Sequence, residues 1–136
     1  MGAWGGNTFD NDTARDWAYG LEDTHDLALV TSALQAVVGS GAEPLDADLA
    51  CEALAACEVI ARLKGQWGAR DAYTEIVDAW VVAHPAAPTS DLVSAATTAI
   101  DRVLSPPSDL VDLWNDSADA EQWRAAVADL RERVIA

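Results

Sequence analysis

Basic residues are scarce in this sequence of 136 residues. Eight lysines and arginines face 23 aspartates and glutamates, which gives a formal net charge of −15 at pH 7. Between Asp16 and Ala61 there is no lysine or arginine at all. A protein that binds nucleic acid directly needs a basic patch, because contacts to phosphates supply most of the affinity. The composition therefore predicts no direct nucleic-acid binding. It favours a basic protein partner, or an acidic surface that serves solubility alone.

Cysteine and histidine are also rare, with two of each. Cys51 and Cys57 are six positions apart in one predicted helix, so they face different sides of it and cannot form a disulfide without breaking it. We interpret both as reduced core residues, which fits a cytoplasmic protein. No cofactor and no metal site is predicted from such a residue set.

Long apolar runs are missing as well. No segment approaches 18 uncharged apolar residues, so we expect no membrane-spanning helix. The N-terminal run lacks a positive region followed by an apolar stretch, so we expect no secretion signal. Half of the residues are apolar and six are tryptophan, which argues against a disordered chain.

Apolar residues recur with a helical period along most of the chain, and no segment alternates with the period of a strand. The stripes include Leu49 in the third predicted helix and Tyr73 in the fourth. We predict an all-α, single-domain irregular or orthogonal bundle of five to seven helices over residues 1–136. Its alanine-rich faces leave a homo-oligomer open. The predicted helices cover approximately residues 10–21, 24–38, 46–64, 70–83 and 89–104, a short segment after Ser108, and a last segment from about 119.

The common catalytic motifs are absent, including a nucleophile elbow, a phosphate-binding loop, a dinucleotide fingerprint and a His-Glu-x-x-His helix. The densest polar cluster lies near the N-terminus. Asp12 and Asp16 are four positions apart and would share a helix face, where oxygen ligands suit Mg²⁺ or Ca²⁺. With His25 and Glu58 they form the basis of an alternative hypothesis, a small metal-dependent hydrolase. Helix caps and solvated carboxylates explain the same residues.

Glu58 lies inside the most apolar predicted helix. A buried carboxyl group would tend to keep its proton, as a general acid must. An ordinary ion pair with Arg62, four residues further on, is the interpretation we favour.

The opening Met-Gly-Ala-Trp-Gly of residues 1–5, followed by Phe9, Asn11-Asp12, Ala14 and Asp16-Trp17, resembles a family of small acidic bacterial proteins of unknown function. The resemblance continues through Glu58 and to the last predicted helix. It brings no established activity. It does imply that one set of residues belongs to the family's motifs, and these are our candidate binding residues: Trp4, Asn11, Asp12, Asp16, Trp17 and Glu58. The same set can also form a structural corner, by which we mean a turn that glycine makes possible, a tryptophan that covers the core and a polar residue that caps a helix.

Our leading functional hypothesis is a non-enzymatic interaction protein that binds a basic protein partner through an acidic face. An immunity-like or antitoxin-like role is one version of it. Besides the hydrolase, a nucleic-acid mimic is an alternative, which would need carboxylates along a surface ridge at about phosphate intervals.

Overall fold

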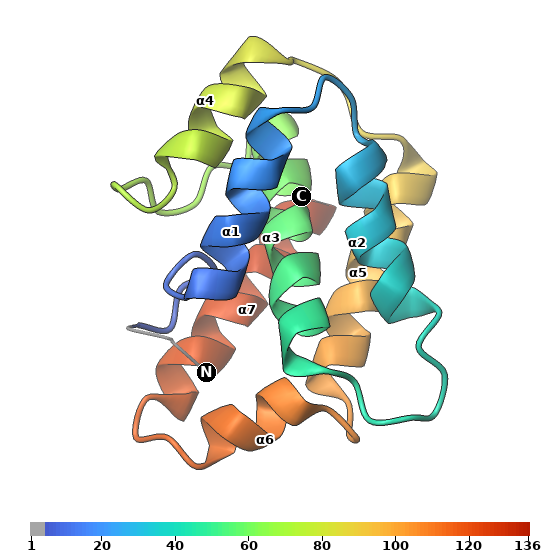
Figure 1. Cartoon of the computed structure of the whole chain (residues 1–136), viewed down its shortest axis with the longest axis vertical. Helices are drawn as coiled ribbons and strands as arrows, with labels where there is room; N and C mark the ends of the chain where they lie inside the picture. The colour runs from blue at the N-terminus through green and yellow to red at the C-terminus, as the bar shows by residue number, and fades with distance from the viewer. Residues whose placement is uncertain (1–4) are drawn as a thin grey trace.

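Helix α3 forms the centre of the fold. The computed structural model describes residues 5–136, and within these residues it contains seven α-helices and no β-strand (Figure 1). The all-α prediction is therefore confirmed, at the upper end of the expected number of helices. The helices are α1 (Asp12–Glu22), α2 (Ala28–Val38), α3 (Ala47–Leu63), α4 (Glu75–Ala83), α5 (Ser90–Leu104), α6 (Asp109–Asn115) and α7 (Ala120–Ile135).

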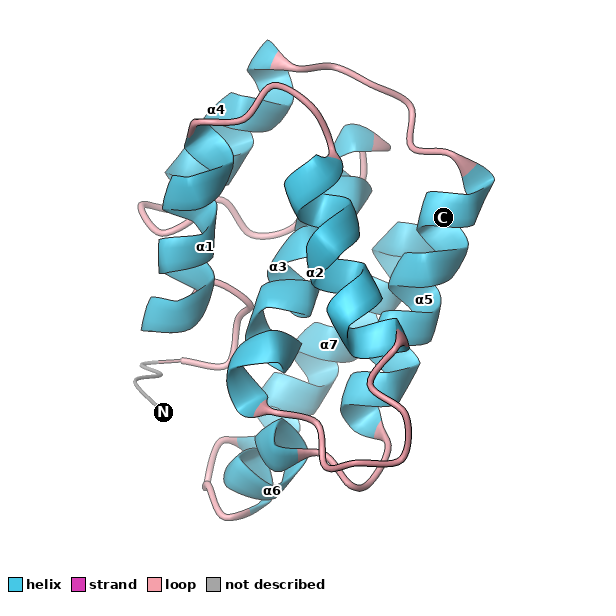
Figure 2. Ribbon diagram, turned by 45° about the vertical axis from the view of Figure 1, so that its right-hand side comes forward, coloured by secondary structure: helices cyan, strands magenta, loops and turns pink. Residues whose placement is uncertain are grey.

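The composition of α3 explains its central place. Twelve of its 17 residues are buried, and most of them are alanine or cysteine. A helix that is apolar around its whole circumference is stable only when other elements surround it, and short side chains let those elements come close. Accordingly, α3 contacts every other helix. Helices α1 and α4 lie on one side of it and α2 and α5 on the other, while α6 closes one end (Figures 1 and 2).

Helix caps fix three of the predicted helix starts. The side chains of Asn11, Asp46 and Thr89 accept hydrogen bonds from backbone N–H groups in the first turns of α1, α3 and α5. Such bonds satisfy donors that have no partner within the helix. After the end of α3, Gly65 adopts a φ of 82°, a left-handed conformation that favours glycine. The predicted stop at this glycine is confirmed.

Two helices begin later than predicted, because local side-chain bonds stabilise turns instead. Helix α2 starts at Ala28 rather than at residue 24, since the Thr24 hydroxyl donates to the Leu21 carbonyl at the end of α1. Helix α4 starts at Glu75 rather than at residue 70, since the Asp71 carboxylate accepts from the backbone N–H groups of the two residues before α4. Aspartate and threonine commonly compete with helix in this way.

Leu49 and Tyr73, which we expected on buried stripes, are each more than one third exposed. Leu49 is 37% exposed in the first turn of α3, and Tyr73 is 40% exposed in the turn before α4. The guanidinium of Arg15 lies 5.3 Å from the centre of the Tyr73 ring. Leu49 lies in the first turn of its helix and Tyr73 just before its helix, where the helical stripe does not yet face the core. In the described part of the chain, no helix is long and apolar enough to cross a membrane.

A short backbone pairing positions α6. The Leu45 N–H donates to the Pro107 carbonyl at 3.1 Å, and the Asp109 N–H donates to the Leu45 carbonyl at 3.0 Å. Leu45 is buried, so this pairing ties the loop before α3 to the loop before α6 inside the fold. As a result, the first turns of α3 and α6 lie side by side.

Candidate functional site

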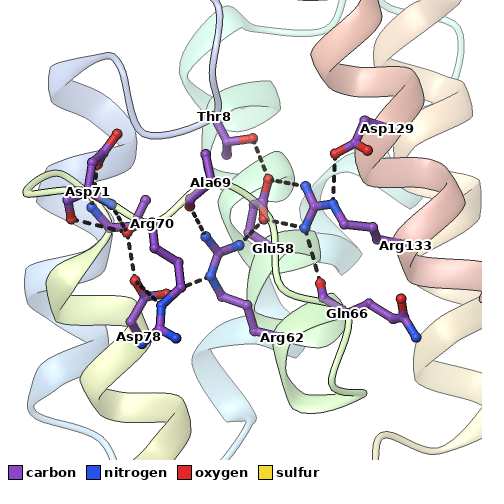
Figure 3. A network of polar contacts seen from close by, with 11 residues as sticks. Thr8, Glu58, Arg62, Gln66, Ala69, Arg70, Asp71, Asp78, Asp129 and Arg133 are labelled. Atoms are coloured by element: carbon purple, nitrogen blue, oxygen red, sulfur yellow. Dashed lines mark hydrogen bonds and ion pairs between the residues drawn. The ribbon is translucent and has the colours of Figure 1, made fainter.

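Glu58 lies at the centre of a buried ionic network (Figure 3). Arg133 of α7 binds both of its carboxylate oxygens, with Nη2 2.9 Å from Oε1 and Nη1 3.0 Å from Oε2. Arg62 donates from Nη1 to Oε2, and the Thr8 hydroxyl donates to Oε1 at 3.1 Å. Glu58 is only 6% exposed. The predicted ion pair with Arg62 is thus confirmed, within a larger set of contacts that joins α3, α7 and the N-terminal segment.

Arg62 carries the network from α3 to α4. Its Nε donates to Asp78 Oδ1 at 2.7 Å, and its Nη2 donates to the Ala69 carbonyl at 2.7 Å. The other oxygen of Asp78 accepts from the Thr74 hydroxyl at 2.6 Å. Arg62 is 2% exposed and Asp78 is 7% exposed. Their charges are therefore compensated by direct contact rather than by water.

Further contacts of two arginines complete the network. Arg133 donates from Nε to Asp129 at 2.8 Å and from Nη1 to the Gln66 carbonyl at 3.3 Å. Arg70 lies with its Nε 3.7 Å from Asp78 Oδ2 and its guanidinium 4.5 Å from the centre of the Trp67 ring. Buried charges are tolerated when each is paired and hydrogen-bonded, as they are here. Among the described residues, each charged side chain of the network contacts an opposite charge, and the network links α3, α4 and α7.

A small pocket of about 80 Å³ opens beside the network. Ligand sites for small molecules are usually about 300–1,000 Å³, so this pocket is smaller than such sites. Burial raises the pKa of Asp10 at its edge, the hydrogen bond from the Asn7 N–H lowers it, and the charge of Asp71 raises it further. The lining residues are Asn7, Thr8, Phe9, Asp10, Glu58, Arg62, Ala69, Asp71, Thr74, Ala126, Asp129 and Arg133.

Two of the candidate binding residues meet at Thr8. Asn11 caps α1 by accepting from the Ala14 N–H at 2.8 Å and donates from Nδ2 to the Thr8 carbonyl at 3.0 Å. The Thr8 hydroxyl is bonded to Glu58. Trp17 is buried in the core at 8% exposure. These contacts account for Asn11, Trp17 and Glu58 as parts of a structural corner, and their role in binding stays a prediction.

The remaining candidates lie elsewhere. Asp12 and Asp16 of α1 are exposed, and so is His25 in the loop after α1. Trp4 lies outside the residues that the structure describes. Within residues 5–136, no group of three or more histidines, cysteines, aspartates or glutamates is arranged to hold a metal ion. The residues of the hydrolase hypothesis therefore do not form such a group.

Sequence reasoning predicted only the pair of Glu58 and Arg62 and missed the other members of the network, among them Thr8, Asp78 and Arg133. Arg133 is 75 positions away from Glu58, and no local pattern connects residues at that separation. Asp78 carries a weak sequence signal, because it interrupts an apolar stretch, and the structure shows that it is buried.

A second polar feature, which we call the acidic groove, lies between the first turn of α3 and α6. Asp109 and Asp112 of α6 and Asp116 directly after it follow one another at spacings of three and four, which places them on one side of this segment. Leu113 lies between them and is 45% exposed. The groove is lined by Asp46, Ala47, Asp109, Asp112, Leu113 and Asp116.

A protein-family model described as a domain of unknown function, DUF4259, matches residues 2–126. The chain belongs to this family. The match confirms the expected relation to a family without an assigned activity. The matched range includes Glu58, Arg62 and Asp78 but ends before Arg133. No curated protein and no solved structure matches the chain significantly.

Proposed function

We propose that this DUF4259 protein is a non-enzymatic binding module that holds a basic segment of a protein partner against its acidic surface. One observation carries the proposal. Of the 23 carboxylates in the sequence, only four are paired with an arginine within the described residues. These four are Glu58, Asp78, Asp101 and Asp129.

The few basic residues hold the protein's own segments together instead of neutralising its surface. Arg62 and Arg133 are in the buried network. Arg102 donates to the backbone carbonyls of Ser105, Glu43 and Pro107, each at 2.9 Å. The surface therefore keeps a dense negative potential, which attracts a basic partner over a distance and speeds association.

The acidic groove is the face that we expect to make the contact. A solubilising surface needs only scattered charge, whereas here three carboxylates surround an exposed leucine, Leu113. None of the side chains of Asp109, Asp112 and Asp116 has a hydrogen bond or ion pair within the described residues. A lysine or arginine next to an aliphatic side chain would meet both the carboxylates and Leu113. A basic toxin or enzyme that the protein keeps inactive, as in an immunity-like or antitoxin-like role, is one such partner.

Affinity capture with two matched variants tests the proposal. The tagged full chain is incubated with lysate of its own host at low and at physiological salt, and the eluted proteins are identified by mass spectrometry. One variant replaces Asp109, Asp112 and Asp116 with lysine. The other variant replaces the same number of exposed carboxylates in and just after α1, namely Asp16, Glu22 and Asp23, with lysine.

We expect a basic protein that is retained by the native chain and by the α1 variant and is lost with the α6 variant. Loss with the α1 variant alone would move the contact to the N-terminal candidates. Release of the captured protein by duplex DNA would identify nucleic-acid mimicry as the form of binding. A column that retains no basic protein even at low salt would contradict the proposal.

A further inference from the structure

The two histidines of the sequence meet beside one tryptophan. Trp80 of α4 is 5% exposed, and its Nε1 donates to the Thr24 carbonyl at 2.9 Å, which fixes the loop that carries His25. The same indole stacks on His84 just after α4, with ring centres 4.5 Å apart and an angle of 22° between the planes. The rings of His25 and His84 have their centres 5.7 Å apart at an angle of 43°. Trp80 thus holds two imidazoles from distant parts of the chain near each other.

The hydrogen bond of His84 decides which ring nitrogen is free. Its Nδ1 lies 2.9 Å from the Trp80 carbonyl oxygen. Because a carbonyl oxygen only accepts, Nδ1 must carry the hydrogen, and in the neutral ring Nε2 then carries a lone pair. Histidines that bind metals usually donate one ring N–H to a backbone carbonyl or carboxylate in this way, which orients the other nitrogen toward the ion.

The separation of the rings fits a shared ion. A Zn–N bond of about 2.0–2.1 Å puts the ring centre about 3.2 Å from the metal. Two imidazoles on one ion then have their centres about 5.2 Å apart at the tetrahedral angle and about 6.4 Å apart when they are opposite. The observed 5.7 Å lies between these values.

We propose that His25 and His84 bind one divalent transition-metal ion, such as Zn²⁺, with water in the remaining positions. Within the described residues no third histidine, cysteine or carboxylate completes the set, so water must supply the other ligands. The exposed carboxylates of Glu22, Asp23 and Asp26 flank His25 in the sequence and raise the local concentration of cations. A bound ion would fasten the α1–α2 loop to the end of α4.

The thiols do not compete for this ion. Both cysteines are buried in α3. Burial raises the pKa of Cys51 to about 12, helped by the nearby charges of Asp48, Asp46 and Glu52. Burial also raises the pKa of Cys57. A metal binds the thiolate form, which both residues disfavour in the folded protein.

Calorimetric titration of the full chain with ZnCl₂ at about pH 7.5, where imidazole is mostly neutral, tests the proposal. Variants His25→Gln and His84→Gln each remove one ligand, and Glu132→Gln removes an exposed carboxylate of α7 as a matched control. We expect the native chain and Glu132→Gln to bind one ion per chain with the same affinity. Each histidine variant should bind at least about tenfold more weakly, because even loss of a group that only orients a ligand costs about 10–100-fold.

A second readout keeps folding defects apart from loss of the site. Cu²⁺ at the same position should quench the fluorescence of Trp80, which stacks on His84, and the quenching should saturate at one equivalent. His25 is exposed, so His25→Gln should retain the native circular dichroism spectrum and still lose this quenching. Native-like Zn²⁺ affinity in either histidine variant would overturn the proposal. So would binding of several ions that both histidine variants leave unchanged, since that pattern belongs to the acidic surface as a whole.

Discussion

The substitution Glu58→Gln tests whether the buried network holds the fold together. It keeps the size of the side chain and removes its charge. Arg62 and Arg133 would then face a neutral amide, with side chains that are 1% and 13% exposed. Water cannot reach either guanidinium well enough to replace the lost carboxylate.

The expected cost follows from this burial. Removing one partner of a buried ion pair typically costs about 3–5 kcal/mol. Arg62 would keep only Asp78 as a charged partner, and Arg133 would keep only Asp129. In a chain of this length, each kcal/mol lowers the Tm by about 3–6 °C. The Tm of Glu58→Gln should therefore fall by about 10–30 °C.

Urea unfolding followed by tryptophan fluorescence, together with thermal melts followed by circular dichroism, measures the change. Asp101→Asn is the matched control, because it breaks an arginine pair whose side chains are 38% and 54% exposed. Exposed pairs contribute little, so the control should unfold close to the native chain. If Glu58→Gln and Asp101→Asn unfold at the same urea concentration, the network does not have the structural role that we assign to it.

Three further predictions concern single residues. Gly65→Ala should destabilise the protein by about 1 kcal/mol, because alanine is strained at a φ of 82°. Gly20→Ala inside α1 should stabilise it by about 0.5–1 kcal/mol, because alanine favours helix more than glycine does and a Cβ has room there. The urea midpoints of the two variants measure both effects. Asp10→Asn should raise the Tm at pH 7, and the gain should shrink as the pH falls to about 4, because the folded-state pKa of Asp10 is raised and its ionised form weakens the fold. Cys51 and Cys57 should react with a thiol reagent at pH 8 only after unfolding, and rapid labelling of the native chain would contradict their burial.

The helices could be predicted from sequence because their signals are local. The caps at Asn11 and Asp46 and the stop at Gly65 depend on residues within a few positions of one another. The starts of α2 and α4 were predicted too early, because another kind of local interaction competes with helix there. Thr24 and Asp71 fit a helical pattern, yet their side chains form equally local bonds, three positions away, that stabilise turns instead of helix.

The network could be predicted only in part. The pair of Glu58 and Arg62 follows from a spacing of four on a helix. Arg133 binds the same carboxylate because α7 packs against α3, and this packing depends on the whole fold. The meeting of His25 and His84 has the same origin, since α1 and α4 lie side by side. The spacing of residues in the sequence does not predict contacts between such distant parts of the chain.

The position of Arg133 has a practical consequence for anyone who expresses a shorter version of this protein. A fragment limited to residues 2–126 would contain everything that the family model matches. It would nevertheless lose the bidentate partner of Glu58, and with it the fully buried Leu130 and Val134, which complete the core from α7. Such a fragment should be prone to aggregation and a poor material for binding assays. The segment needed for folding therefore extends beyond the segment that sequence similarity outlines.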